Sequence, residues 1–469
     1  MEVTNPKHIN LDIDLQQSIS SEVANHFLII PKQITEHENI FYVDREKELE
    51  LDNIREELKI IFNKEVILEP IDSVLIKKAL SINYRKNNET LKRVSYNNDF
   101  LESLIFEAKH INASDIHIEI YEEDVRVRLR IDGHLIEKNH IKKDNYLELI
   151  NQIKIKSNLD ITEKRLPQDG RIEFDDFDIR VSILPTHHGE KVVMRILGRD
   201  ASHLDINVLG FEKDDLQLYL EAVKKTNGII LISGPTGSGK TTTLYATLKH
   251  LNDIKRNIVT VEDPIEYTLK GVNQVQLKEN IGLTFTTALR SFLRQDPDII
   301  MLGEIRDAQT AQMAIRASLT GHLVLSTIHT NSAIGTISRL VDMGIPPFLI
   351  AETINISVAQ RLIRTLCKTC KQLQDFNDSY LPISFSPVEK IEKHFVAVGC
   401  EDCYYTGYMG RRAIYEILPV THNVADAIKK NVLEQSDFIK KKRLSNKAFE
   451  LFSKGLTSLD EIYPILINS

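Results

Sequence analysis

The chain has 469 residues, of which 42% are hydrophobic and 27% are charged, a mixture typical of a globular protein with about three domains. Its 59 Lys and Arg against 67 Asp and Glu give a net charge of −8, which leaves only a local basic groove as a route to nucleic-acid binding. No apolar run approaches the roughly 20 residues that span a bilayer, and the first ten residues lack the features of a signal peptide. We therefore expect a cytoplasmic protein that reaches a membrane only through partners.

The first 90 residues alternate strand-like segments with a charged helical stretch. The strand-like segments lie at 26–30, 40–43 and 66–69, and the helical stretch lies near 46–62. This order predicts a small α/β module of the βαβ type. Polar residues at 85–90 are expected to link this module to the next part of the chain.

The next part of the chain begins with a predicted helix at 99–111 and continues with alternating apolar and polar residues. Alternation of period two predicts strands that bury one face, and together they indicate an antiparallel sheet with helices, an α+β domain. These strands are expected at 116–120, 125–131, 171–174, 179–183 and 192–196. Residues 198–210, with a glycine at each end, are the expected hinge to the following domain.

From residue 211 to about 366, short apolar strands alternate with helical patterns. The strands are expected at 228–233, 257–261, 299–302 and 322–327. Strands that alternate with helices predict a doubly wound α/β core with a mainly parallel sheet. The remaining residues hold all the cysteines and a helical tail.

The strongest chemical signal is a glycine-rich loop that satisfies the pattern G-x-x-x-x-G-K-[ST], with an apolar strand before it and a helical pattern after it. Glycines let backbone N–H groups approach phosphates closely, Lys240 reaches the terminal phosphates, and the Thr241 hydroxyl ligates Mg²⁺. A chance glycine-rich turn would not come with these flanking elements. The predicted nucleotide-binding residues of the loop are Gly234, Pro235, Thr236, Gly237, Ser238, Gly239, Lys240 and Thr241.

Carboxylates follow the second and third of these core strands. Glu262, Asp263 and Glu266 come after the second strand, and Glu304 comes after the third. Ligands of open α/β sheets bind at this edge, where a carboxylate can hold the Mg²⁺ hydration shell or orient the attacking water. The spacing leaves both roles open, and the alternative for each carboxylate is a solvated strand end or a helix cap.

Two histidines, His322 and His329, flank the fourth core strand. A single histidine is most often a structural residue. After a phosphate-binding loop and a strand that ends in Gly-Glu, either histidine is a candidate sensor of the γ-phosphate, and His329 lies in the more polar run.

The four cysteines form two Cys-x-x-Cys pairs, Cys367 with Cys370 and Cys400 with Cys403, and 29 residues separate the pairs. In a cytoplasmic chain, two such pairs are typical of one tetrahedral Zn²⁺ site with a structural role. The alternatives are coincidence, a pair of redox dithiols, or a disulfide framework, which a cytoplasmic location disfavours. The long separation predicts a small subdomain between the pairs.

Several longer motifs carry a resemblance to a known family. Residues 293–307 resemble the Walker B region of type II and type IV secretion ATPases, 320–331 resemble their His box, and 262–266 resemble their Asp box. The resemblance extends to 113–119, 168–171 and the cysteine pairs, and it covers roughly residues 95 to 420.

The resemblance is closest to type II secretion assembly ATPases and type IV pilus extension ATPases. It implies an α/β fold with a RecA-like P-loop ATPase core at 205–366, preceded by a PAS-like α+β domain at 95–198. It further implies a small N-terminal α/β module for partner docking at 1–90, a tetracysteine zinc subdomain at 367–410 and a C-terminal helical region at 411–469.

The resemblance also implies roles for single residues. It assigns 234–241 to Walker A, the acidic residues after the second core strand to the Asp box, and Glu304 to Walker B. Arg171 and Arg180 stand where the family's N-terminal domain offers arginines to the nucleotide, and Arg195 is a weaker third candidate. A rigid fork of donors suits phosphate, although a salt bridge on the sheet surface is the alternative for each arginine.

The resemblance implies a cytoplasmic hexameric motor that hydrolyses ATP with Mg²⁺ and drives assembly of pilin-like subunits in type II secretion, a type IV pilus or a competence pseudopilus. Its implied partners are further copies of the chain, an inner-membrane platform protein and a docking protein, with no direct nucleic acid. The alternatives are a nucleic-acid-translocating P-loop ATPase, disfavoured by the acidic balance and the 7% aromatic content, and an inactive adaptor, disfavoured by the intact Lys240 and Glu304.

Overall fold

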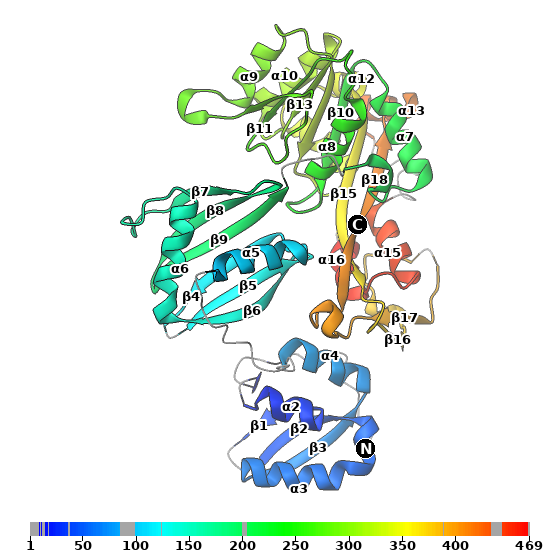
Figure 1. Ribbon diagram of the computed structural model, residues 1–469. Helices are drawn as coiled ribbons and strands as arrows, with labels where there is room; N and C mark the ends of the chain where they lie inside the picture. The colour runs from blue at the N-terminus through cyan, green and yellow to red at the C-terminus, as the bar shows by residue number, and fades with distance from the viewer. Residues whose placement is uncertain are drawn as a thin grey trace.

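The computed structural model describes residues 9, 11, 15–16, 18–35, 38–84, 99–122, 124–198, 204–387, 389–432 and 443–467. Figure 1 shows three sheet-containing bodies, with the N-terminal module at the bottom, a second sheet beside the middle of the molecule and the largest sheet at the top. The linker predicted at 85–90 and the middle of the predicted hinge, 199–203, lie outside the described residues.

The N-terminal module contains a three-stranded sheet in which β1 (Ile29–Ile34) is antiparallel to β2 (Glu38–Asp44) and β2 is parallel to β3 (Glu65–Ile71). Helix α3 (Leu51–Phe62) is the crossover between the parallel strands, so the predicted βαβ unit is confirmed. The strand expected at 26–30 begins only at residue 29. The preceding residues belong to a helix instead, because the Ser20 side chain caps its amino end. Further helices in the described part of the module are α2 (Ser21–Phe27), η1 (Arg45–Glu50) and α4 (Ser73–Asn83).

The second sheet has six antiparallel strands in the order β6-β5-β4-β9-β8-β7. Helices α5 (Phe100–His110) and α6 (Lys143–Lys156) pack on the apolar face, which includes Ile116, Ile179 and Met194. The opposite face is charged. The strands are β4 (Asp115–Ile120), β5 (Asp124–Ile131), β6 (His134–Lys142), β7 (Gln168–Glu173), β8 (Phe177–Thr186) and β9 (Gly189–Gly198).

The third sheet has seven strands in the order β12-β11-β13-β14-β10-β15-β18, and every pair is parallel except the last. One apolar cluster lies on each face, so the sheet is covered by helices on both sides and the predicted α/β core is confirmed. Its strands are β10 (Gly228–Ser233), β11 (Ile258–Glu262), β12 (Asn273–Gln276), β13 (Ile299–Leu302), β14 (Leu323–Ile328), β15 (Ile354–Leu366) and β18 (Tyr408–Pro419). Its helices are α7 (Lys213–Val223), α8 (Lys240–Leu251), α9 (Phe285–Phe292), α10 (Ala308–Leu319), α11 (Ala333–Asp342) and α12 (Pro347–Thr353).

The last two strands of this sheet form a long antiparallel pair whose register runs from Ile356 opposite Pro419 to Leu366 opposite Tyr408. Residues 411–419, which we expected in a helical region, are therefore a strand. Residues 413–418 are all buried, because helices pack over both sides of this strand. A short run that is apolar except for Glu416 does not distinguish a covered strand from a buried helix.

The chain between β15 and β18 holds the cysteines and a two-stranded antiparallel sheet, β16 (Gln372–Asp375) and β17 (Lys393–Val396). The expected small subdomain between the cysteine pairs is thus present. Helices α13 (His422–Lys429), α15 (Leu444–Ser453) and α16 (Leu459–Ile467) follow, and Figure 1 shows α15 and α16 beside the β15–β18 pair.

Candidate functional site

The glycine-rich loop connects β10 to α8, as the pattern predicts. Gly234, Gly237 and Gly239 have φ of 150°, 78° and 86°, which L side chains rarely adopt. The ammonium of Lys240, the first residue of α8, donates to the carbonyl oxygens of Gly234 and Pro235 at 2.8 and 3.0 Å. The loop therefore curls around the amino end of α8, the arrangement that binds phosphate.

Gln360 of β15 supports this loop from the neighbouring strand. Its amide oxygen accepts a hydrogen bond from the Thr243 hydroxyl at 2.9 Å, and the side chain is buried. A Cβ atom on Gly234 would lie 2.5 Å from the backbone carbonyl oxygen of Gln360, and one on Gly239 would lie 2.8 Å from the side-chain nitrogen of Gln360. Both glycines are therefore required by close packing as well as by φ. Sequence reasoning missed Gln360, because no motif marks it.

Glu304 lies just beyond the carboxyl end of β13 and contacts two basic side chains. Arg306 donates to one of its carboxylate oxygens, and His329 Nε2 lies 3.4 Å from the other. Hydrogen bonding to Glu304 raises the pKa of Arg306, which lies 4.0 Å from Asp263 as well. The structure thus brings Glu304, His329 and Asp263 to one edge of the sheet, and Arg306 is a member of this group that sequence reasoning missed.

Glu262, the last residue of β11, is enclosed. Its carboxylate accepts hydrogen bonds from the hydroxyls of Tyr245 and Thr260, the latter at 2.6 Å, and from the Gln274 side chain at 3.2 Å. Burial raises the pKa of Glu262, and these three donors act in the opposite direction. Glu262 is therefore held by the protein interior, whereas Glu304 is partly exposed.

A cavity of about 470 Å³ joins the phosphate-binding loop to these acidic residues. Glu266 lines the cavity together with Asp263, Glu304 and His329, and Arg411 of β18 contributes a further cation. Burial lowers the pKa of Lys240, and the negative charge of Glu304 partly offsets this effect. The cavity therefore brings together phosphate-binding groups, carboxylates and cations in a volume that suits a nucleotide.

His322 does not reach this cavity. It precedes β14, whereas His329 follows it, and a strand of this length separates the two histidines by about 20 Å. The His322 ring instead lies 2.9 Å from the Ala317 carbonyl oxygen through Nδ1. Within this chain, His322 therefore lies at the amino end of β14, at the end of the strands opposite to the cavity.

Arg171, Arg180 and Arg195 lie side by side across β7, β8 and β9, where Arg180 is the register partner of both others. All three side chains are exposed, and none lines the cavity of their own chain. Arg171 pairs with Asp178, and Arg195 Nε donates to Asp115 at 2.9 Å. The structure thus gathers the three predicted arginines into one row on the charged face of the six-stranded sheet.

The four cysteine sulfurs converge at the end of the β15–β18 pair. The Sγ atoms of Cys367 and Cys400 lie 3.8 Å apart, those of Cys370 and Cys403 lie 3.7 Å apart, and all four lie within 4.8 Å. These separations exceed a disulfide bond of about 2.05 Å, and they match the edge of about 3.8 Å that a tetrahedron with Zn–S distances of about 2.3 Å requires. The backbone N–H of Gly399 donates to Cys370 Sγ at 3.3 Å, which helps to fix the position of this sulfur. The donor set therefore fits Zn²⁺.

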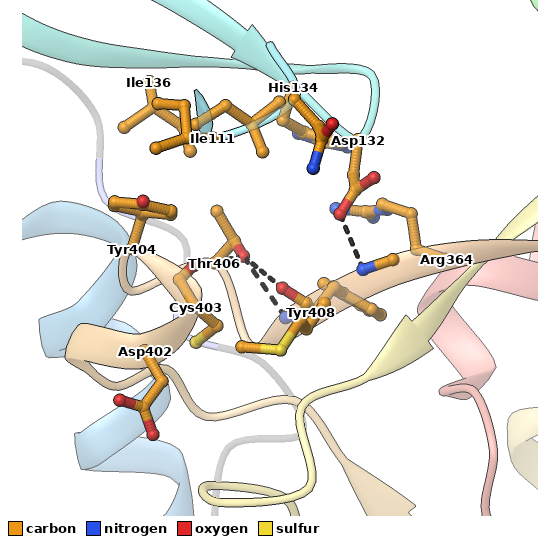
Figure 2. A pocket seen from close by; sticks show the side chains of 14 residues that line it. Ile111, Asp132, His134, Ile136, Arg364, Asp402, Cys403, Tyr404, Thr406 and Tyr408 are labelled. Atoms are coloured by element: carbon orange, nitrogen blue, oxygen red, sulfur yellow. Dashed lines mark hydrogen bonds between the residues drawn. The ribbon is translucent and has the colours of Figure 1, made fainter. Parts of the chain in front are cut away.

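A second cavity, of about 310 Å³, lies between the six-stranded sheet and the cysteine loop (Figure 2). Asp132, in the turn between β5 and β6, accepts a hydrogen bond from the backbone N–H of Gly410 at 2.7 Å and lies 3.3 Å from Arg411 Nε. Arg411, which lines the first cavity, is therefore also in contact with the six-stranded sheet of the same chain.

A glycine-rich loop between strand and helix, with carboxylates at the same edge of a largely parallel sheet, defines a P-loop ATPase. Residues 91–464 match the family described as "Type II/IV secretion system protein". The chain therefore belongs to the type II/IV secretion ATPase family, as the sequence motifs indicated, and it is an ATPase.

Two relatives illustrate the match. The chain is 42% identical over 450 residues to the type IV pilus assembly ATPase PilB of Myxococcus xanthus, which covers 88% of this chain and 79% of that protein. It is 48% identical over 340 residues to type II secretion system protein E of Pseudomonas aeruginosa, which covers 71% of this chain and 68% of that protein.

Solved structures agree with the fold. A crystal structure of the pilus retraction motor PilT with bound ADP is 26% identical, with a TM-score of 0.54, and covers 76% of this chain and 94% of that one. The ATPase DotB of Legionella pneumophila is 22% identical, with a TM-score of 0.59, and the match covers 80% of this chain and 97% of that one. The latter likeness concerns the fold alone.

We predict that Gly234→Ala abolishes tight ATP binding, because its Cβ would overlap the Gln360 carbonyl oxygen and displace the loop. The dissociation constant for ATP, measured by calorimetry, should rise at least about tenfold. Gly344→Ala is the matched control, since Gly344 also has positive φ (82°) but has open space around its Cβ, far from the loop. Equal affinities of the two variants would contradict the packing argument.

Proposed function

We propose that this chain is a cytoplasmic hexameric motor ATPase that drives assembly of pilin-like subunits in type II secretion, a type IV pilus or a competence pseudopilus. The observation that carries the proposal is the cavity in which Lys240, Glu304 and His329 converge. The names of the relatives, a pilus assembly ATPase and a type II secretion protein, support the assignment to assembly.

In this proposal, residues 234–241 bind the phosphates of ATP, and the Thr241 hydroxyl and Asp263 hold Mg²⁺ and its water shell. The metal ion, when bound, neutralises charge on the transferred phosphoryl group. Lys240 lies at the positive end of α8, so it adds a cation where the charge develops. Glu266 borders the same cavity as a further acidic group.

Glu304 orients the attacking water, and His329 lies beside it as the sensor of the γ-phosphate. The exposed imidazole of His329 is 3.4 Å from Glu304, so a change at the phosphate can reach the carboxylate through one contact. Arg306 holds the other carboxylate oxygen, which fixes the direction in which Glu304 points.

We predict that Glu304→Gln lowers the rate of Mg-ATP hydrolysis by about 10²- to 10³-fold, because a neutral amide cannot accept a proton from the attacking water, while ATP still binds. Phosphate release and nucleotide affinity measured on the same preparation check both parts. Glu279→Gln, which removes an exposed carboxylate near Arg306, should keep wild-type activity. A Glu304→Gln variant that retains more than about a tenth of the rate would contradict the assignment.

Arg171 and Arg180 complete the nucleotide site of another subunit. Their exposure and their absence from the cavity of their own chain support this part of the proposal. A guanidinium delivered by a neighbour stabilises the charge of phosphoryl transfer and couples hydrolysis to movement of one subunit against the next. In a closed ring of subunits, here a hexamer, each nucleotide site receives the arginines of one neighbouring subunit.

Residues 198–210 act as the hinge between the six- and seven-stranded sheets, and the N-terminal module docks on a partner of the membrane machine, next to an inner-membrane platform protein. In the described part of the chain, no helix is both long and apolar enough to cross a membrane. We propose a peripheral position on the cytoplasmic face of the inner membrane, reached through these partners.

The cysteine cluster holds one Zn²⁺ with a structural role, because four sulfur ligands complete a tetrahedron and leave no position for a substrate. Elemental analysis of the purified protein should give about one zinc per chain. Cys400→Ser should remove most of the metal and lower the melting temperature, whereas Thr369→Ser, in the same loop but without a sulfur, should change neither. A fully folded Cys400→Ser protein with unchanged melting temperature would contradict the structural role.

A further inference from the structure

We propose that Tyr245 is a positioning residue for ATP hydrolysis. Its hydroxyl joins the phosphate-binding helix α8 to residues 262–267, called here the acidic loop, and fixes Glu262 as a buried anchor of that loop. This inference rests on the proposed ATPase site. It assigns different roles to the glutamates at the ends of the neighbouring strands β11 and β13. Glu262 is the anchor, and Glu304 is the group that faces the reacting water.

Tyr245 lies one turn beyond Thr241 on α8, and its side chain is buried. Its hydroxyl donates to the carboxylate of Glu262. The backbone N–H groups of Glu266 and Tyr267 point at the same hydroxyl oxygen from 3.3 and 3.4 Å. One hydroxyl therefore contacts both ends of the acidic loop, its first residue and the two that close it.

Gln274 of β12 strengthens the connection. Its side-chain nitrogen donates to Glu262 at 3.2 Å and to the Tyr267 carbonyl oxygen at 2.9 Å, and its amide oxygen accepts the backbone N–H of Leu269 at 2.8 Å. The ring of Tyr267 packs edge-on against that of Tyr245, with centroids 5.2 Å apart. Strand, helix and loop are thus fixed around the Glu262 carboxylate.

This enclosure decides what Glu262 can do. Its carboxylate accepts three hydrogen bonds from the protein, and 4% of the residue is exposed. A group that activates water needs a free oxygen directed at that water. Glu304 meets this requirement better, because it lines the cavity and the side chains that contact its carboxylate, Arg306 and His329, are exposed.

The consequence concerns the carboxylates that the loop carries. Asp263 and Glu266 flank the anchored segment, and both line the nucleotide cavity. Since α8 also carries Lys240 and Thr241, the Tyr245 hydroxyl sets the distance between the phosphate-binding residues and these carboxylates. Without this hydroxyl, the carboxylates of the loop would shift relative to the phosphate-binding residues. A shift of about 1 Å at a reacting centre lowers the rate by up to about 10²-fold.

The test is Tyr245→Phe, which keeps the ring and removes the hydroxyl. We expect kcat for Mg-ATP hydrolysis to fall about tenfold or more, with KM for ATP within about twofold of wild type, because the phosphate-binding groups are untouched. Tyr219→Phe is the matched control: that buried hydroxyl contacts Thr247 on the same helix at 2.8 Å, away from the cavity, and its loss should leave kcat unchanged.

A second pair of variants tests the anchor. Glu262→Gln keeps one side-chain oxygen, which can still accept from Tyr245, while the amide nitrogen replaces the oxygen that faces Thr260 and can donate to that hydroxyl. We therefore expect it to retain at least about ten times the activity of Glu304→Gln. The double variant with Tyr245→Phe should hydrolyse ATP no more slowly than the less active of the two single variants, because both changes act through one contact.

The outcomes separate the two proposals. A wild-type protein without ATPase activity would refute the proposed function. With active wild type, an unchanged kcat in Tyr245→Phe, an equal loss in Tyr219→Phe, or a Glu262→Gln protein as inactive as Glu304→Gln would overturn the positioning role while the ATPase assignment stands.

Discussion

The antiparallel pairing of β15 with β18 is the constraint on which the nucleotide site depends. It extends from Ile356 opposite Pro419 to Leu366 opposite Tyr408. Gln360 on the first strand supports the phosphate-binding loop, and Arg411 on the second lines the nucleotide cavity. A paired ribbon of this length is stiff, because its ladder hydrogen bonds and its packing in the sheet fix both strands.

The same ribbon carries the cysteine cluster at its outer end, where Cys367 follows β15 directly and Cys403 precedes β18 by a short turn. A metal ion that joins the two strands there would hold the register at the far end of the ribbon. The turn with Asp132 meets the ribbon at Gly410 and Arg411, so the six-stranded sheet also contacts it. The nucleotide cavity, the cysteine cluster and the six-stranded sheet are therefore connected through one structural element.

Local patterns predicted the elements that depend on near neighbours. The core strands at 228–233 and 299–302 and the phosphate-binding loop could be read directly, because short buried strands and a glycine-rich turn have local signatures. Strand β6 was missed because a bulge opposite Val127 and Arg128 interrupts its alternation.

The β15–β18 pairing was missed for a different reason, since the two strands are separated by the whole cysteine loop and no local signal relates them. The same holds for the site. The motifs identified Lys240 and Glu304, but the hydrogen bonds of Glu262 with Tyr245 and the far position of His322 follow from tertiary packing. Spacing indicates which residues lie at a strand end, and packing decides which carboxylate is enclosed by hydrogen bonds and which is partly exposed.

The central claim is that the site is completed by arginines from another subunit. The most direct measurement is the rate of Mg-ATP hydrolysis per chain against protein concentration, together with mixtures of Glu304→Gln and Arg171→Ala chains. The account predicts that the rate per chain rises with concentration and that the mixture recovers part of the activity both variants lack. A rate independent of concentration and unaffected by Arg171→Ala would contradict it, because catalysis would then be complete within one chain.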